Sequence, residues 1–234
     1  GLGRLGAKVS IATSLSHDLD GQRFKAALEA DGVDLSCVGI VNKPSPTALV
    51  EEGTKESGPR YVFTLSGTAF DEPAPLPLPW SDDLAHIHAG SIAAILGPMA
   101  HSVLDAFAAA RGKRTTSYDP NIRPMITPDR DKTRSDVEAR VALADIVKAS
   151  EEDLEWLYPD HQPHESILNW LALGPKLMIL TRGGKGAEAF TAKDHLIVPA
   201  PAITVGDTVG AGDSLMSALL FAMERDGRSE EHTS

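Results

Sequence analysis

The residues best suited to chemistry lie near the carboxyl end of the chain, in the segment Asp207–Ser214 (DTVGAGDS). Gly210, Ala211 and Gly212 stand where the pattern passes from a loop into a helix, and their small side chains let a ligand approach the backbone. The first turn of a helix leaves N–H groups unpaired, and the helix dipole favours negative charge there. Asp213 falls in that same turn. The segment therefore predicts an anion site, suited to a phosphate group, beside a carboxylate.

These parts fit phosphoryl transfer, which needs positioning, charge stabilisation and a base near the nucleophile. Asp213 would orient the accepting hydroxyl and take its proton, an effect of roughly a hundred- to ten-thousand-fold. Each N–H of the anion site would add about 3 kcal/mol in the transition state, by analogy with oxyanion holes. No Gly-Lys-Ser/Thr follows, so the segment is not a Walker A loop. By spacing alone, a glycine-rich helix start with an acidic first turn explains it equally well.

Strand and helix patterns alternate along the chain and must position these residues. Apolar segments predict strands at 8–13, 85–89, 114–118, 145–148 and 177–181. Helical spacing predicts helices at 22–30, 99–111, 135–144, 164–173 and from Gly210 onward. Ser150 with Asp153 predicts a further, capped helix. The alternation indicates an α/β protein with a mostly parallel central sheet covered on both faces.

Two hairpins interrupt this alternation. The β-like segments 47–51 and 60–65 flank the turn-rich stretch 52–59, and together they predict a small flap over about 42–70. Segments 187–190 and 196–199 predict a second hairpin.

The composition of the 234 residues, 42% hydrophobic and 24% charged, is that of a soluble globular protein. The longest apolar run, Leu215–Met223, is too short for a bilayer span, so no membrane partner is expected. The net charge is -11 and no basic patch is present, which argues against nucleic-acid binding. The single cysteine, Cys37, fits a reducing compartment, and we expect a cytoplasmic protein.

The segment Asp207–Leu219 (DTVGAGDSLMSAL) resembles the C-terminal signature of the ribokinase-like (PfkB) family of carbohydrate kinases. Most of the chain shares the resemblance. Gly90-Ser91 and Asp119–Pro124 (DPNIRP) are similar to motifs of fructokinase-like members, and Thr181–Gly186 looks like the family's "TxGxxG" loop. Asp18 with Gly21 resembles a "DxxG" turn, for which we expect a structural role. The resemblance implies a ribokinase-like three-layer α/β/α sandwich with a small β flap, or lid.

Carried over position by position, the resemblance implies roles for the following residues. Asp213 would be the catalytic base, and the anion hole would consist of Gly210, Ala211 and Gly212. Asn121 and Arg123 would face the cleft, where the guanidinium can pair with phosphate or substrate oxygens. The nucleotide would be lined by Thr181, Gly183 and Gly186.

The resemblance also implies metal positions. Asp207 would help to hold a monovalent cation, although members of the family differ in this. The family's "NxxE" element, tied to magnesium and phosphate, corresponds here to Ser150–Asp153 (SEED), so Ser150 and Asp153 would take its two positions. A hydroxyl and a shorter carboxylate depart from the pattern. A helix capping box explains the same two residues, and both interpretations can hold together.

The function implied by the resemblance is ATP-dependent phosphorylation of a sugar hydroxyl, with ATP, Mg²⁺ and in some members K⁺. Fructose is the first expectation. A 2-keto-3-deoxygluconate kinase, a nucleoside kinase or an inactive sugar- or nucleotide-binding fragment are the alternatives. The flap would close over the sugar, and its open strand edges predict a homodimer formed through the lid.

We interpret residues 1–227 as a partial domain of this family. The family's first strand, with its substrate aspartate, is expected before Gly1, and helices near the adenine after the last residue. Residues 228–234 resemble the translation of a sequencing adapter, so we expect them to be a non-native tail.

Histidine side chains are further candidate metal ligands. His86 and His88 alternate on a strand and share one face, but no third ligand has suitable spacing, which argues against a metal site. His161 and His164 lie in a polar stretch and are expected to be solvated. Ser91 and Ser214 lack a nucleophile elbow, so hydrolase chemistry is not favoured.

Overall fold

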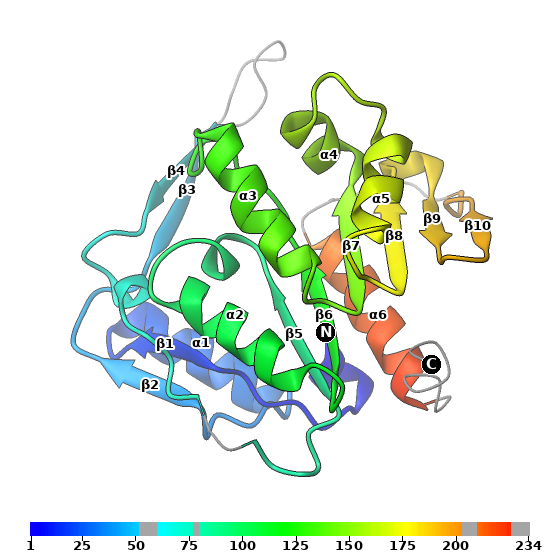
Figure 1. The fold of residues 1–234 in the computed structure, drawn as a ribbon. Helices are drawn as coiled ribbons and strands as arrows, with labels where there is room; N and C mark the ends of the chain where they lie inside the picture. Colours follow the sequence, from blue (N-terminus) through cyan, green and yellow to red (C-terminus); the bar gives the residue numbers. More distant parts are fainter. Residues whose placement is uncertain (52–59, 77–79, 203–209, 226–234) are drawn as a thin grey trace.

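The computed structural model describes residues 1–51, 60–76, 80–202 and 210–225 (Figure 1). Its centre is a six-stranded sheet in the order β10-β9-β8-β7-β6-β5. Neighbouring strands from β5 to β8 are parallel, whereas β9 pairs antiparallel with both β8 and β10. The strands are β5 (His86–Gly90), β6 (Thr115–Asp119), β7 (Ile146–Ser150), β8 (Leu177–Thr181), β9 (Ala187–Phe190) and β10 (His195–Val198). The predicted, mostly parallel central sheet and the second hairpin are confirmed.

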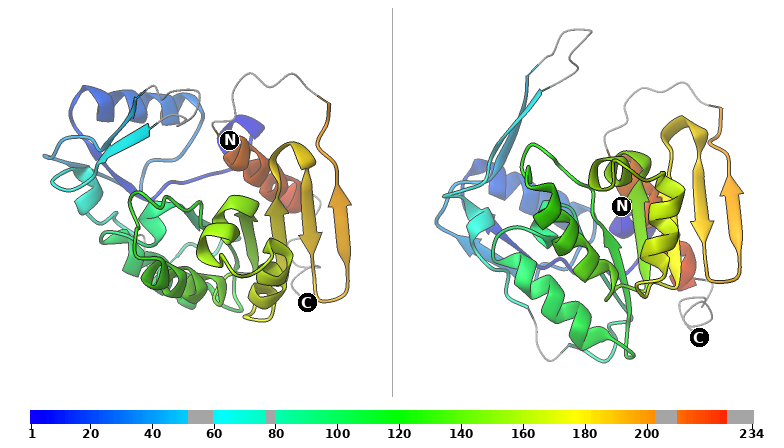
Figure 2. Two further views of the ribbon diagram at one scale, coloured as in Figure 1. Left: turned by 90° about the horizontal axis from the view of Figure 1, so that it is seen from above. Right: turned by 45° about the horizontal axis from the view of Figure 1, so that its top comes forward.

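Helices cover this sheet on both faces (Figure 2). One face carries α2 (Met99–Ala110), α3 (Arg130–Val141), α4 (Glu151–Leu157) and α5 (Pro163–Leu171). The main core lies beneath them and includes fully buried Phe107, Tyr118, Leu154, Ile167 and Trp170. The other face carries α6 (Ala211–Arg225) and the 3-10 helix η1 (Leu2–Leu5), where Met216, Leu220 and Met223 pack with Ile146. The predicted three-layer sandwich is therefore confirmed.

The helix predictions hold with shifted ends. The largest shift is in α3, which begins at Arg130 after the N-cap Asp129, whereas a start at 135 was predicted. Its first turn is wholly polar, so the apolar periodicity begins only later. Ser150 caps α4 as predicted, and α6 begins at Ala211, directly after Gly210.

The N-terminal region forms a separate two-stranded sheet, in which β1 (Thr13–Ser16) pairs in parallel with β2 (Val38–Val41) across α1 (Leu19–Ala30). The strand predicted at 8–13 is wrong in position. Within that stretch, Ser10 makes only an isolated bridge to Asp34. The paired segment is Thr13–Ser16, because β2 lies alongside it. The β2 strand, whose short apolar run contains Gly39, was not predicted from its pattern.

The predicted flap is confirmed as an antiparallel hairpin of β3 (Thr47–Glu51) and β4 (Arg60–Thr64). It is not hydrogen-bonded to the central sheet and projects from the body of the molecule (Figure 2). Short 3-10 helices complete the fold: η2 (Ala69–Asp71), η3 (Ile92–Ala94) and η4 (Gly183–Lys185). Across the described residues, every helix is too short or too polar to traverse a bilayer.

Candidate active site

Four parallel strands end at the same edge of the sheet. Gly90 of β5 is in register with Asp119 of β6, and Ser150 of β7 with Thr181 of β8. In open α/β sheets, ligands bind at this carboxyl edge because the loops that follow the strands converge there. The parallel topology thus places four sequence motifs at one edge of the sheet: Gly90-Ser91, Asp119–Pro124, Ser150–Asp153 and Thr181–Gly186.

The head of α6 has the open geometry that its glycines predict. Gly210 adopts a left-handed conformation, with φ of 76°, and an added Cβ there would meet no atom within 4 Å. The helix begins with a hydrogen bond in which the Ser214 N–H donates to the Gly210 carbonyl, at 2.9 Å. Asp213 lies in this first turn and is exposed. Among the described residues, no atom therefore crowds the Gly210 backbone on this side.

A buried ion pair lies directly against this helix start. Lys148 of β7 contacts Asp119 of β6, with 2.9 Å from Nζ to Oδ2, and their side chains are only 6% and 7% exposed. A Cβ added to Gly212 would lie 3.1 Å from the Lys148 Nζ. The ammonium group is therefore held beside the proposed anion site. Sequence reasoning missed Lys148, although a lysine within an apolar parallel strand is a signal, because such a charge needs a buried partner.

The electrostatics of this edge are unusual. Burial raises the pKa of the Asp119 carboxyl above its ordinary value, Lys148 lowers it, and the carboxylates of Asp153 and Asp213 raise it again. Within the described part of the chain, Asp119 Oδ1 is buried and accepts no hydrogen bond. Three carboxyl groups and one ammonium group therefore act on one another here, and one buried oxygen remains available to a cation, a proton or water.

Two histidines extend the site to β5. His86 Nε2 and His88 Nδ1 both contact the Ser117 hydroxyl, at 2.7 Å and 2.8 Å, which confirms that they share a face. Burial lowers the pKa of His86 to about 4. Desolvation of the ring by nearby protein atoms also lowers the pKa of His88. The negative charge of Asp213 raises this pKa, and the positive charge of Lys148 lowers it. Among the described residues, no third ligand completes a metal site around this pair.

The two residues predicted for magnesium are engaged with the protein itself. Asp153 Oδ2 accepts hydrogen bonds from the Ser150 N–H and hydroxyl, at 2.9 Å and 2.7 Å, and Oδ1 accepts from the Ile122 N–H at 2.7 Å. The capping box is therefore confirmed. Their metal role stays a prediction, and so does that of Asp207, which lies outside the described residues.

The DPNIRP turn is anchored to the same place. Asn121 is one of two described non-glycine residues with positive φ, at 44°, a conformation that asparagine tolerates well. The Arg123 Nη1 donates to Asn121 Oδ1 at 2.8 Å and to the Ile122 carbonyl at 2.9 Å. Asn121 and Arg123 thus lie together beside the head of α4. Their contact with a ligand remains a prediction.

The loop after β8 contains the residues predicted to line the nucleotide. Thr181 is half-buried, and Gly183 is left-handed, with open space where a Cβ would lie. Gly186 has a different explanation, because a Cβ there would lie 2.1 Å from the Val198 carbonyl oxygen. Its small size is needed for the loop to pack against the end of β10.

The loop is also fixed by ion pairs that the sequence did not predict. Arg182 Nη1 contacts Glu188 Oε1 at 2.6 Å, and its Nε contacts Glu151 at 3.2 Å. Lys185 reaches Glu151 as well, at 3.2 Å. These contacts join the β8 loop to Glu151, the first residue of α4.

Comparisons with known proteins agree with this geometry. The family model described as pfkB family carbohydrate kinase matches residues 1–233. The chain is 35% identical over 231 residues to the fructokinase of Rhizobium leguminosarum bv. trifolii, a match that covers 96% of this chain and 69% of that protein. It is 29% identical over 228 residues to fructokinase-2 of Solanum lycopersicum, covering 95% and 69%.

Solved structures have the same fold. The fructokinase from Vibrio cholerae O395, bound to fructose, ADP and a calcium ion, matches with a TM-score of 0.82 at 26% identity, covering 95% of this chain and 72% of that one. Aminoimidazole riboside kinase from Salmonella enterica matches with a TM-score of 0.82 at 23% identity, covering 96% and 73%. Because the family model spans nearly the whole sequence, this chain belongs to the pfkB family of carbohydrate kinases.

Proposed function

We propose that this sugar kinase transfers the terminal phosphate of ATP to a hydroxyl of fructose, with Asp213 as its base. The observation that carries the proposal is the head of α6. There the exposed Asp213 carboxylate lies in the first helical turn, directly after the uncrowded Gly210, and a buried ammonium group lies against the same turn. The 35% identity to the Rhizobium leguminosarum fructokinase supports fructose over other sugars.

The chain's own groups divide the work of the transfer. The Asp213 carboxylate accepts the proton of the sugar hydroxyl as that oxygen attacks the phosphorus. Unpaired N–H groups at the head of α6 donate hydrogen bonds to the oxygens of the transferring group, where negative charge is spread. Lys148 lies beside Gly212 and adds a positive charge at the same helix start, which favours the negative phosphate group there.

The residues present also fit a divalent cation, which kinases bind together with ATP. Bound Mg²⁺ would neutralise phosphate charge at this edge. Asp119 offers a buried carboxylate oxygen that has no hydrogen-bond partner in the described chain. Asp153, with both oxygens engaged, is better placed to orient the Ile122 backbone and the head of α4. Use of K⁺ through Asp207 remains part of the proposal, as does a cytoplasmic location.

The β3–β4 hairpin would close over the bound sugar. The hairpin forms a two-stranded sheet of its own, without strand pairing to the central sheet, so its closure would break no pairing with that sheet. Closure would exclude water from the phosphate and limit wasteful hydrolysis of ATP.

The test is a coupled ADP-release assay with fructose, 2-keto-3-deoxygluconate, other sugars and nucleosides. Asp213→Asn should lower kcat by roughly a hundred- to ten-thousand-fold, because it removes the base but leaves the fold. Asp20→Asn, an exposed first-turn aspartate of α1, is the matched control and should keep full turnover. Unchanged turnover in Asp213→Asn would refute the base assignment.

The sugar panel and calorimetry distinguish the alternatives. Preference for 2-keto-3-deoxygluconate or a nucleoside would replace fructose but keep the chemistry. Binding of ATP and sugar by calorimetry without any ADP release would indicate a binding module instead of an enzyme.

A further inference from the structure

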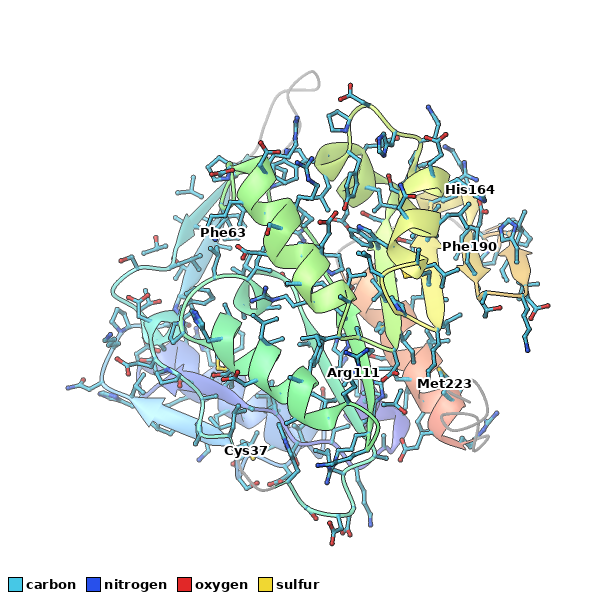
Figure 3. All side chains as sticks on the ribbon, in the orientation of Figure 1. Cys37, Phe63, Arg111, His164, Phe190 and Met223 are labelled. Atoms are coloured by element: carbon cyan, nitrogen blue, oxygen red, sulfur yellow. The ribbon has the colours of Figure 1, made fainter. Side chains whose placement is uncertain are left out.

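A second cluster of ligand-type side chains lies outside the candidate active site. It consists of His164 at the start of α5, Glu188 of β9 and His195 of β10. One ligand atom from each residue lies within 4.8 Å of the others. His164 and Phe190, labelled in Figure 3, show where α5 meets the β9–β10 hairpin. Within the described residues, this is the one group of three or more such side chains close enough to hold a metal ion.

The strand register explains why the cluster forms. Glu188 and Phe190 are two residues apart on β9 and share a face, and His195 is directly opposite Phe190. Glu188 and His195 are therefore diagonal neighbours on that face. The His195 ring stacks on Phe190 with centroids 4.2 Å apart, and the His164 and Phe190 rings are T-shaped with centroids 5.1 Å apart. Phe190 thus holds both imidazoles beside the carboxylate.

Glu188 is arranged as a supported ligand. Its side chain is buried, and its two oxygens have different partners. Oε1 pairs with Arg182 at 2.6 Å, whereas Oε2 faces His195 Nε2 at 2.8 Å. An outer partner on one oxygen fixes the orientation of a ligating carboxylate, as in many metal sites. Oε2 is therefore presented to His195, and His164 lies in the same cluster.

We propose that His164, Glu188 and His195 form a binding site for one Zn²⁺ ion. Two imidazoles and one carboxylate are a common protein ligand set for zinc, with water in the fourth position. Ligand atoms around tetrahedral zinc are roughly 3.4 Å apart, so the cluster needs only small side-chain movements, with the ion replacing the direct contact between His195 and Glu188. Both histidines are exposed, which gives the ion and its water access.

The ion would tie the hairpin to the body of the protein. All four residues of β10 are exposed, and its one strand partner is β9. A ligand from α5 would link this edge to the helical layer. The site does not depend on the phosphotransfer proposal, because none of its residues belongs to that machinery.

The test is zinc binding to the metal-stripped full chain, measured by competition with a chromophoric chelator. We expect one ion per chain at micromolar or lower concentration. His164→Gln and His195→Gln should each weaken binding at least tenfold. His161→Gln is the matched control, because His161 is also exposed and stacks on Tyr158, outside the cluster; it should bind zinc like the wild type.

A second readout checks folding and the proposed link. Zinc should raise the unfolding temperature of the wild type and of His161→Gln, because an ion bound only to the folded state stabilises it. It should not do so in His164→Gln, a change at an exposed side chain that the metal-free protein tolerates. The proposal is overturned if the wild type binds no zinc at micromolar concentration, or if both cluster variants bind it as tightly as the control.

Discussion

At the scale of single residues, the Lys148–Asp119 pair shows what the protein accepts in order to place charge at its site. Both side chains are almost completely buried, and removing two charges from water costs free energy that their attraction only partly offsets. Burial acts on Asp119 more strongly than Lys148 does, since the pKa of the carboxyl remains above its ordinary value. The pair is therefore better explained by its position beside Gly212 than by a contribution to stability.

Removal of Lys148 should expose this cost. Lys148→Met leaves an unpaired buried carboxylate, and we expect a loss of about 3–5 kcal/mol in the free energy of unfolding, measured in urea at neutral pH. Lys132→Met is the control, because Lys132 forms an exposed i,i+4 pair with Asp136. The control should lose no more than about 0.5 kcal/mol.

The pH dependence of Lys148→Met separates charge from packing. A carboxyl whose pKa is raised in the folded state loses stability as pH rises between the unfolded and folded pKa values. The loss in Lys148→Met should therefore shrink when the pH is lowered toward 4 and Asp119 takes up a proton. An equal loss at pH 5 and pH 8 would mean that the methionine disturbs packing, and the charge argument would be wrong.

The candidate site was predictable from the sequence to the extent that its residues follow local patterns. The position of Asp213 in a first helical turn and the Ser150–Asp153 capping box both follow from spacing within a few residues. The partners of Lys148 and Glu188 do not, because they come from other strands and loops. His164 was expected to be solvated; it is exposed, yet its place beside Phe190 depends on how α5 packs.

At the scale of elements, Asp18 joins two segments that the sequence separates. It is the N-cap of α1, where Oδ1 accepts from the Gly21 N–H at 2.8 Å. Its Oδ2 also accepts from the Ser45 N–H at 2.7 Å, just before β3. A Cβ on Gly21 would lie 1.9 Å from the Ser16 carbonyl oxygen, so this turn admits only glycine. The expected structural role of the Asp18–Gly21 turn is confirmed.

These hydrogen bonds predict an acid-sensitive start to the flap. Backbone N–H groups of Gly21 and Ser45 lower the pKa of Asp18 well below its ordinary value. A lowered folded-state pKa means that the stabilisation is present above the unfolded value, roughly 3.9, and is lost as pH falls below it. Asp18→Asn should therefore lower the unfolding temperature at pH 7, and the difference from wild type should narrow toward pH 3.

The matched control for this prediction is Asp20→Asn on the same helix. Asp20 is exposed and, within the described residues, pairs with Arg23 three positions further along the same helix, so its removal should leave the melting profile nearly unchanged. A difference between Asp18→Asn and wild type that stays constant from pH 7 to pH 3 would argue against a role for the Asp18 charge.

The strands that the sequence placed correctly are those of the central sheet. Their runs are apolar because both faces are covered, and this makes the pattern strong. The β1–β2 pair has partly exposed faces and four residues per strand, so its pattern is weak and the predicted strand at 8–13 was misplaced. The sequence thus predicted strands correctly where they are fully buried, and it misplaced a strand where burial is partial.

At the scale of the whole molecule, the parallel topology explains how distant motifs reach one edge. A right-handed crossover returns each strand in the same direction, so every loop that follows a strand emerges at the same end. The alternation of strands and helices in the sequence was enough to predict this arrangement. The distances across the edge were not predictable, because they depend on the stagger and twist of neighbouring strands.

We predict that two copies of the chain form a homodimer through the β3–β4 hairpin. An isolated two-stranded hairpin is at best marginally stable in water, and its strands have open edges. Leu49 and Val62 are direct cross-strand partners, 63% and 36% exposed, so they form an apolar spot on one face. We expect a homodimer at micromolar concentration by size-exclusion chromatography with light scattering. Leu49→Lys should shift the dimer to monomer. Leu196→Lys, at a 60% exposed position on β10, is the control and should leave the dimer intact. A monomeric wild type, or dissociation by Leu196→Lys alone, would contradict an interface at this hairpin.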